Sequence, residues 1–247
     1  MIARIFCTLY TWVIFTPLFL LLTIITALLT ITGCLAGGAK IFAYYPGMIW
    51  SRLTCYLALC PVVVRGRETL DKHCSYVFVS NHQGAFDIFL IYGFLGLPVK
   101  WVMKEGLKRI PLVGAACKAA GFIFVGRSTA QAAARSIREA GSALSTGASI
   151  AIFPEGSRTR DGRMGKFKKG AFLMAAGLHL PIAPITLNGP FHVFPIGSYI
   201  IRPHRMEMII HRPIPTDGIS GSNEEIIALS GEAHRVIASG LWREYLS

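Results

Sequence analysis

Apolar residues fill the first part of the chain almost without interruption. From Ile5 to Ala39 no side chain is charged, and about 20 apolar residues suffice for a helix to cross a bilayer. The run predicts an uncleaved membrane anchor, because it far exceeds the roughly 7–15 apolar residues in the core of a signal peptide. Pro17 and the glycines at 33, 37 and 38 leave two arrangements open, a tilted span and a hairpin within one leaflet.

A second apolar stretch, Ile41 to Leu59, contains Tyr44, Tyr45, Trp50 and Arg52. Aromatic residues beside a single cation are typical of a helix at the level of the lipid headgroups. A helix packed on the core of the following domain would show the same pattern. Both interpretations stand at this point.

Beyond residue 60, short runs of β-branched and apolar residues alternate with helical stretches. Six of these runs predict strands, and a seventh, Met206–Ile210, is a further candidate. The six are Pro61–Val64, Tyr76–Ser80, Val99–Met103, Phe122–Val125, Ser149–Phe153 and Ile182–Leu187.

Two stretches predict helices with recognisable ends. One covers Ser128 to Thr146, where Ser128 and Gln131 form a capping box and Gly147 ends the helix. The other begins with the capping box Ser222 to Glu225 and runs toward Trp242. Alternating strands and helices predict an α/β fold with a mostly parallel sheet covered by helices. The predicted organisation is a membrane-associated helical segment over residues 1–60 and an α/β domain over residues 61–247.

Composition and charge point to an anionic partner. Hydrophobic residues make up 53% of the 247-residue chain, and the formal net charge is +12. Such a surplus favours nucleic acid, acidic lipids or phosphorylated substrates. The long apolar segment makes anionic membrane lipids the better interpretation and argues against nucleic acid, because each Lys or Arg near such a surface contributes about 1 kcal/mol of binding.

The six cysteines show no CxxC pair and no paired Cys/His spacing. Neither a zinc site nor a disulfide framework is expected from such a distribution. The domain is therefore expected to face a reducing compartment.

The first group of residues with chemical potential is Asn81-His82-Gln83, followed by Asp87, directly after a predicted strand. On one helix, residues five apart lie about 140° apart and could not meet. They can meet if His82 lies in the turn after the strand and Asp87 in the first turn of the next helix. A carboxylate would then hold one imidazole nitrogen and leave the other free as a general base. A structural hydrogen bond is the alternative for such a pair taken alone.

Cations follow three of the predicted strands. Arg158 lies in Phe153-Pro154-Glu155-Gly156-Ser157-Arg158, Lys104 follows Val99–Met103, and Arg127 follows Phe122–Val125. Ligands of α/β sheets bind at this end of the strands. An arginine can bind a phosphate bidentately, and a glycine such as Gly156 permits close approach of a backbone. Together these residues predict a phosphate pocket.

Four blocks in order resemble the 1-acylglycerol-3-phosphate acyltransferase family. The blocks are Asn81-His82-Gln83 with Asp87, Lys104 to Pro111 with Gly121 to Arg127, Phe153 to Arg158, and Pro181 to Ile185. The resemblance covers roughly residues 60 to 215. Gly126 stands where the family often has Asp, and Ser157 where it more often has Thr.

The resemblance implies a role for each matching residue. His82 would deprotonate a glycerol hydroxyl, and Asp87 would orient His82. Binding of the acceptor's phosphate would fall to Lys104, Arg127 and Arg158, in a pocket shaped by Glu155 and Gly156.

The resemblance also implies the partners. The donor would be acyl-CoA or acyl carrier protein and the acceptor a lysophospholipid, with no cofactor or metal ion. The catalytic domain would face the cytoplasm at a membrane, the inner membrane if the source is bacterial. A different acceptor, such as another lysophospholipid or an acyl-amino lipid, fits the same blocks.

Two other classes of function compete with acyl transfer. A serine hydrolase would need a Gly-x-Ser-x-Gly elbow, whereas Ser157 lies in Pro-Glu-Gly-Ser-Arg. An inactive lipid- or nucleic-acid-binding protein would not need the His82 and Asp87 pair. The basic block Lys166 to Gly170 is either a contact for headgroups or carrier phosphates, or a solvated loop.

Overall fold

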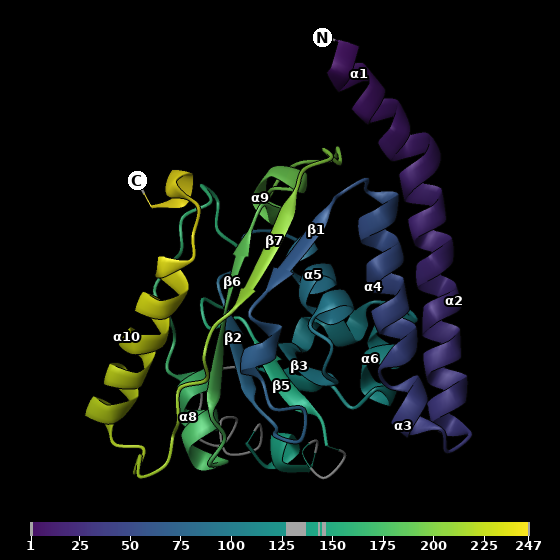
Figure 1. The fold of residues 1–247 in the computed structure, drawn as a ribbon. Helices are drawn as coiled ribbons and strands as arrows, with labels where there is room; N and C mark the ends of the chain where they lie inside the picture. The colour runs from purple at the N-terminus through teal and green to yellow at the C-terminus, as the bar shows by residue number, and fades with distance from the viewer. Residues whose placement is uncertain (1, 127–136, 143, 145–146, 247) are drawn as a thin grey trace.

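Seven strands form one central sheet in the computed structural model, which describes residues 2–126, 137–142, 144 and 147–246 (Figure 1). Their order across the sheet is β1-β7-β6-β2-β5-β3-β4. The strands are β1 Val62–Arg65, β2 Val77–Ser80, β3 Val99–Lys104, β4 Ile123–Val125, β5 Ser149–Ile152, β6 Ile182–Asn188 and β7 Met206–Ile210.

The sheet is parallel over five neighbouring strands and reverses direction once. β6, β2, β5, β3 and β4 pair in parallel. β7 runs antiparallel to β6, and β1 pairs in parallel with β7. The carboxyl ends of five strands therefore share one edge of the sheet, where ligands of such sheets bind.

The predicted α/β class is confirmed, and all seven predicted runs are strands whose ends lie within one residue of the prediction. The capping box of the last helix, α10 (Asn223–Ser239), is present, with Ser222 and Glu225 bonded to each other's backbone N–H. Most of the helix predicted over 128–146 lies outside the described residues, although 137–142 are helical.

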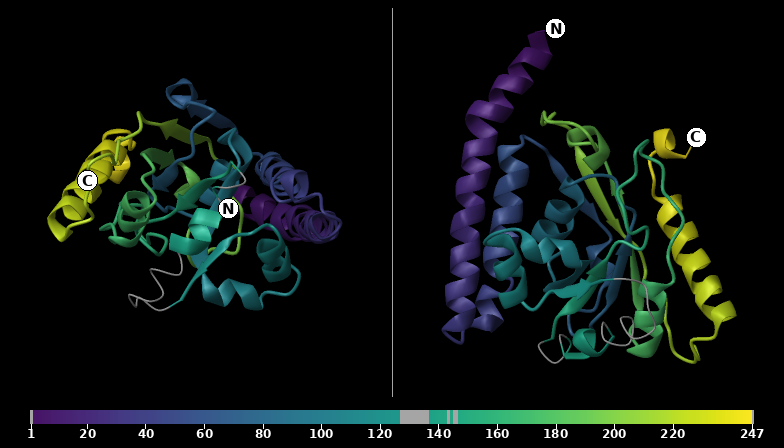
Figure 2. Two further views of the ribbon diagram at one scale, coloured as in Figure 1. Left: turned by 90° about the horizontal axis from the view of Figure 1, so that it is seen from below. Right: turned by 180° about the vertical axis from the view of Figure 1, so that it is seen from behind.

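Helices cover both faces of the sheet (Figures 1 and 2). Along β2, Phe78 packs into one core, whereas Val77 and Val79 pack into the other. The Phe78 side is covered by α5 (Phe86–Phe94) and by the N-terminal helices, and the other side by α8 (Gly170–Gly177) and α10. Alternation of side chains along a strand produces these two cores from a single run of apolar residues.

The N-terminal apolar run forms one long helix. α1 (Ile2–Leu9), a π-helical turn (Tyr10–Phe15) and α2 (Thr16–Leu35) follow one another, and the helix from Arg4 to Leu35 is long and apolar enough to cross a membrane. Pro17 does not break it and directly follows the π-helical turn, where the hydrogen bonds already depart from the regular α-helical pattern.

The chain reverses after α2. Gly37 has φ +86°, and α3 (Ala39–Phe42) and α4 (Tyr45–Leu57) lead back beside α2 (Figure 1). The ring of Phe42 fills the space where a Cβ on Gly33 would lie, 2.1 Å from that position. The glycines thus permit both the turn and its close packing, and α2 and α4 form a helical hairpin.

One face of α4 packs on α5. A Cβ on Gly47 would lie 2.3 Å from the ring of Tyr92, so only a glycine permits this approach. The Nε atom of Arg52 donates a hydrogen bond of 2.6 Å to the carbonyl of Gly93. The outer face, with Ile49 among its residues, is exposed. Of the two interpretations of residues 41–59, packing on the domain core describes the inner face of α4.

Aromatic side chains continue this packing from α2 to the sheet. Trp50 of α4 lies 4.9 Å from Phe89 of α5, and Phe89 lies 5.2 Å from Phe86. From α2 and the turn before it, Phe19 contacts Phe89 and Phe15 contacts Phe86. The N-terminal hairpin and the helix that carries Asp87 therefore share one apolar core.

The glycine contacts predict opposite effects for one substitution at two helical sites. Gly47→Ala should lower stability by about 1–3 kcal/mol, because the added methyl overlaps the buried ring of Tyr92. Gly231→Ala, in exposed α10 with open space around it, should raise stability by about 0.5–1 kcal/mol. Thermal unfolding of both variants in one detergent measures the difference. A higher melting temperature for Gly47→Ala would contradict the described packing.

Candidate active site

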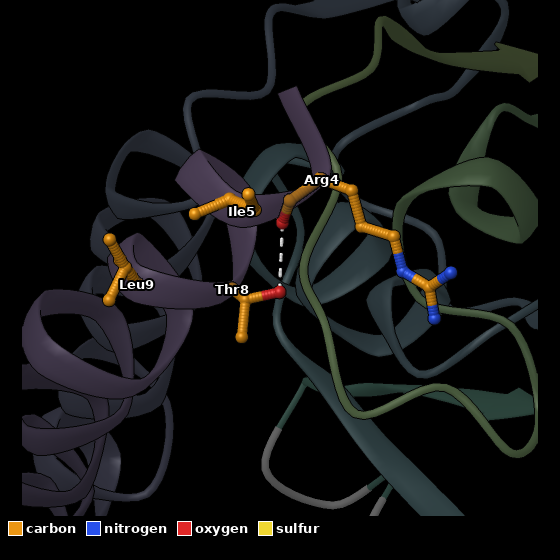
Figure 3. A pocket seen from close by; sticks show the side chains of 4 residues that line it. All are labelled: Arg4, Ile5, Thr8 and Leu9. Atoms are coloured by element: carbon orange, nitrogen blue, oxygen red, sulfur yellow. Dashed lines mark hydrogen bonds between the residues drawn. The ribbon is translucent and has the colours of Figure 1, made fainter. Parts of the chain in front are cut away.

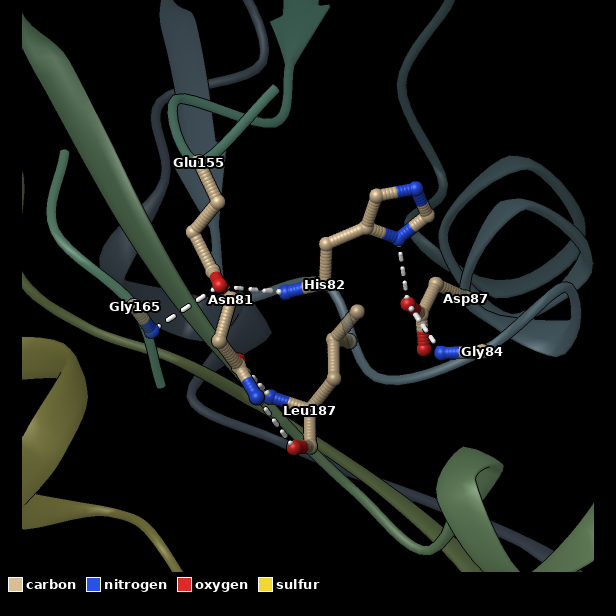
Figure 4. Close-up of polar contacts among 7 residues, drawn as sticks. All are labelled: Asn81, His82, Gly84, Asp87, Glu155, Gly165 and Leu187. Atoms are coloured by element: carbon tan, nitrogen blue, oxygen red, sulfur yellow. Dashed lines mark hydrogen bonds and ion pairs between the residues drawn. The ribbon is translucent and has the colours of Figure 1, made fainter. Parts of the chain in front are cut away.

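His82 and Asp87 meet at the carboxyl end of β2 (Figure 4). The strand ends at Ser80, His82 lies in the turn that follows, and Asp87 lies in the first turn of α5. Nδ1 of His82 is 2.7 Å from Oδ2 of Asp87. No described residue bonds to Nε2 of His82. An ionised Asp87 accepts a hydrogen bond from a protonated Nδ1 of His82. The lone pair of Nε2 then stays available to a substrate.

Asp87 is fully buried, and this burial raises the pKa of its carboxyl group. The contact with His82 and the backbone N–H groups of Gly84 and Gln83 act in the opposite direction. Oδ2 accepts both the His82 contact and a 2.9 Å hydrogen bond from the Gly84 amide. A buried carboxylate held in this way stabilises a positive charge on the imidazole, because that charge compensates its own.

Asn81 and Gly84 fix the turn that carries His82. The side-chain amide of Asn81 donates to the carbonyl of Leu187 at 2.9 Å and accepts from its N–H at 2.8 Å, which ties the turn to β6. A Cβ on Gly84 would lie 2.7 Å from the carbonyl oxygen of Pro190, in the short helix α9 (Pro190–Val193). Asn81 belongs to the Asn81-His82-Gln83 motif, but its place in the sequence did not predict this anchoring role.

Phe153 supports the imidazole from one face. Its ring stacks on His82 with centroids 3.9 Å apart and planes 8° apart. Trp101 of β3 stacks in turn on Phe153 at 5.5 Å. His82 is thus held by a carboxylate at its edge and by an aromatic ring on its face. Sequence reasoning missed this role, since a phenylalanine after a strand usually belongs to the core.

Glu155 joins the His82 turn to the loop after β5. Its Oε1 accepts a hydrogen bond from the His82 amide at 2.8 Å, and its Oε2 accepts one from Gly165 at 2.9 Å (Figure 4). Burial raises the pKa of this carboxyl group, and the two amides oppose the rise. Both oxygens accept hydrogen bonds from backbone amides, so the charge of Glu155 is directed at the main chain.

The loop that carries Arg158 lies against His82. The amide of Thr159 donates to the carbonyl of His82 at 2.9 Å, so both polar backbone groups of His82 bond to residues 155–159. Arg158 is half-buried, and no described residue forms an ion pair with it. The structure therefore brings the segment that carries this predicted cation beside the predicted base.

The other two predicted cations follow neighbouring strands. Lys104 ends β3 and is exposed, without an ion-pair partner in the described part of the chain. Trp101 pairs with Ala151, which sets Lys104 level with the turn after β5. Arg127 lies outside the described residues.

Two surface depressions lined by residues of the N-terminal helices lie apart from the His82 site. One open depression on α1 is lined by Arg4, Ile5, Thr8 and Leu9 (Figure 3). A groove of about 320 Å³ runs between α2 and α4 and is almost entirely apolar. Neither borders His82. Among the described residues, no group of three or more His, Cys, Asp or Glu side chains is arranged to hold a metal ion.

Comparison with known proteins identifies the family. Residues 61–188 match the family model described as Acyltransferase, which is more than half of the chain. The chain belongs to this acyltransferase family. The residues from Asn81 to Gly165 that build the site, and Leu187 that anchors Asn81, lie within the matched region.

Similar proteins include a chloroplastic 1-acyl-sn-glycerol-3-phosphate acyltransferase of Arabidopsis thaliana, 34% identical over 81% of this chain and 54% of that protein. A 1-acyl-sn-glycerol-3-phosphate acyltransferase of Borreliella burgdorferi is 36% identical over 58% of this chain and 57% of its own length. The acyltransferase chain thus spans about half the length of the curated relatives it matches.

A solved structure is similar over nearly the whole length. The 1-acyl-sn-glycerophosphate (LPA) acyltransferase PlsC of Thermotoga maritima superposes with a TM-score of 0.78 at 27% identity, over 97% of this chain and 95% of that one. The resemblance to this family predicted from four sequence blocks is confirmed, together with the α/β fold preceded by a long apolar helix.

The bonds of Glu155 predict a stability effect in this acyltransferase. In Glu155→Gln, the amide keeps one acceptor oxygen, so the N–H of either His82 or Gly165 loses its partner. A buried unpaired N–H costs about 1–3 kcal/mol. Thermal unfolding should show this loss, whereas Glu232→Gln on the exposed face of α10 should unfold like the wild type. Equal melting temperatures for Glu155→Gln and wild type would contradict the bridging role.

Proposed function

We propose that this acyltransferase moves a fatty acyl group from a thioester to the sn-2 hydroxyl of 1-acyl-sn-glycerol-3-phosphate, giving phosphatidic acid. The observation that carries the proposal is the contact of His82 with Asp87, beside a loop whose Arg158 has no acidic partner among the described residues. The names of the similar proteins from plants and bacteria support the same acceptor.

In the proposed reaction, Nε2 of His82 takes the proton of the glycerol hydroxyl as the oxygen attacks the thioester carbonyl. The carbon–sulfur bond then breaks, and the imidazolium returns the proton to the departing thiolate. Asp87 keeps Nδ1 protonated and stabilises the imidazolium. General base catalysis of this kind contributes roughly 10²–10⁴-fold, and fixed positioning of the two substrates supplies further acceleration.

Arg158, Lys104 and Arg127 are proposed to bind the acceptor's phosphate, since an arginine can bind a phosphate through two parallel hydrogen bonds. Gly156 belongs to the same loop. The donor is either acyl-CoA or acyl carrier protein, because both present the same thioester.

We place the protein at a membrane with its catalytic domain on the cytoplasmic side. The exposed leucines and isoleucines of α2 support contact with lipid, and the net charge of +12 supports attraction to anionic lipids. Six free cysteines fit a reducing compartment.

Substitutions of His82 and Asp87 test the mechanism. His82→Ala should lower kcat for acyl transfer to lysophosphatidic acid by about 10²–10⁴-fold. The kcat of Asp87→Asn should fall by a similar factor. The side-chain amide of Asn can donate a hydrogen bond to Nδ1 and would favour the tautomer that carries its proton on Nε2. Transfer of radiolabelled acyl groups from acyl-CoA measures both variants, with His73→Ala as the control because His73 is an exposed histidine in another loop. A fully active His82→Ala protein would refute the mechanism, and an acceptor panel of other lysolipids tests the alternative acceptors.

The stack on His82 predicts a further kinetic effect. Phe153→Leu should lower kcat about tenfold with KM for both substrates unchanged, because the imidazolium loses the face of an aromatic ring. Phe153→Tyr keeps the ring and should retain most of the activity. Equal kcat values for the Leu and Tyr variants would exclude an electrostatic role of the ring.

A further inference from the structure

Lys168 lies directly over Gly156, in the loop that follows β5. A Cβ built on Gly156 would be 2.7 Å from Nζ of Lys168 and 3.2 Å from its Cε. Gly156 also has φ +74°, a conformation that other residues rarely adopt. The positive φ thus favours a glycine, and the end of the Lys168 side chain occupies the space that a side chain would take. The sequence had suggested only that Gly156 lets a backbone approach closely.

The surrounding chain holds Lys168 in this place. Its amide donates to the carbonyl of Pro154 at 2.9 Å, which ties the basic block to the start of the site loop. The preceding residue, Phe167, turns the other way and packs against Phe172 and His234. Backbone pairing and an apolar neighbour therefore direct the Lys168 side chain toward Gly156.

The three lysines of the block have different surroundings. Lys169 donates a hydrogen bond to the side chain of Asn223, at the start of α10. All three lysines are exposed, and no contact of the Lys166 side chain is described. Lys168 lies against Gly156 of the site loop, so the three lysines are not equivalent.

No carboxylate neutralises Lys168 within the described part of the chain. The carboxylate next to Gly156 in sequence, Glu155, already binds the amides of His82 and Gly165. On the other side of Gly156, Arg158 also has no acidic partner among the described residues. The loop that contacts the backbone of His82 thus carries Arg158, and Lys168 lies against its Gly156, both without an acidic partner among the described residues.

A terminal phosphate monoester suits such a pair. Near neutral pH it carries about −1.5 to −2 charges and three acceptor oxygens, whereas a phosphodiester carries one charge. We propose that Lys168 binds the acceptor's phosphate together with Arg158, and that this pair selects a phosphate monoester over a diester headgroup. The inference rests on the proposed function, since it concerns the acceptor of that reaction.

Kinetics of the full-length protein in neutral mixed micelles test this role. Lys168→Ala should raise KM for lysophosphatidic acid about tenfold, the loss expected for a hydrogen bond to a charged group. Its kcat and its KM for acyl-CoA should stay within about twofold of wild type. Inhibition by lysophosphatidylglycerol, a diester of the same chain length, should also change by less than about twofold. Lys168→Arg keeps the charge and should recover most of the affinity.

Lys166→Ala is the matched control, because it removes one positive charge from an exposed site in the same block. It should leave every constant at the wild-type value. An equal rise in KM for Lys166→Ala would show a general surface-charge effect and overturn the inference. A rise in KM for acyl-CoA alone would assign Lys168 to the donor and overturn it as well.

The outcomes separate this inference from the proposed function. Wild-type protein that does not acylate lysophosphatidic acid would refute both. Active wild-type protein with an unchanged Lys168→Ala variant would refute only the role of Lys168. Unchanged melting temperatures of the variants would show that their kinetic constants report on the site.

Discussion

The carboxylate of Glu155 bonds to the backbone of two segments, 73 residues before it and 10 residues after it. One segment carries His82, and the other closes the loop that contains Arg158. Strand pairing alone sets the distance between β2 and β5, but it does not fix the turns beyond their ends. The two amides of Glu155 and the bond from Thr159 to His82 supply that constraint. The relative position of the base and the cations therefore depends on main-chain hydrogen bonds.

The N-terminal helices pack into the same core as the helix that carries Asp87. Trp50 and Phe19 contact Phe89 of α5, and α5 begins with the turn that holds Asp87. A sequence boundary near residue 60 separates an apolar segment from an α/β domain in composition. It does not separate two cores, because Phe15 and buried residues of α4, α5 and the sheet form one cluster, against which Phe19 of α2 packs. Removing the hairpin would expose the aromatic face of the helix that positions the carboxylate.

Local patterns predicted most of the fold. Short apolar runs between turn residues gave all seven strands, because a buried strand of a parallel sheet must be apolar along its whole length. The order of the strands and the reversal at β7 depend on contacts between distant residues, which a local pattern does not contain. The approach of α4 to α5 at Gly47 likewise became visible only with Tyr92 in place.

The sequence likewise predicted only part of the candidate site. The turn-plus-helix geometry of His82 and Asp87 followed from their spacing, since no single helix could bring them together. The stack of Phe153 on His82 joins segments far apart in the chain, and the contact of Lys168 with Gly156 depends on how the loop after β5 folds back. Nothing in their own sequence distinguishes these residues from an ordinary core aromatic and an ordinary surface lysine. Glu155 was expected near a phosphate, but both its oxygens are committed to backbone amides.

The hairpin of α2 and α4 has the domain at its side along much of its length. The hydroxyl of Thr11, near the N-terminus of the long helix, accepts a hydrogen bond from the amide of Ile201. Farther along, α2 packs against α6 (Val113–Ala119). Protein thus covers one side of the hairpin. Only the remaining surface, with Leu21, Ile25 and Ile49 among its exposed residues, is open to lipid.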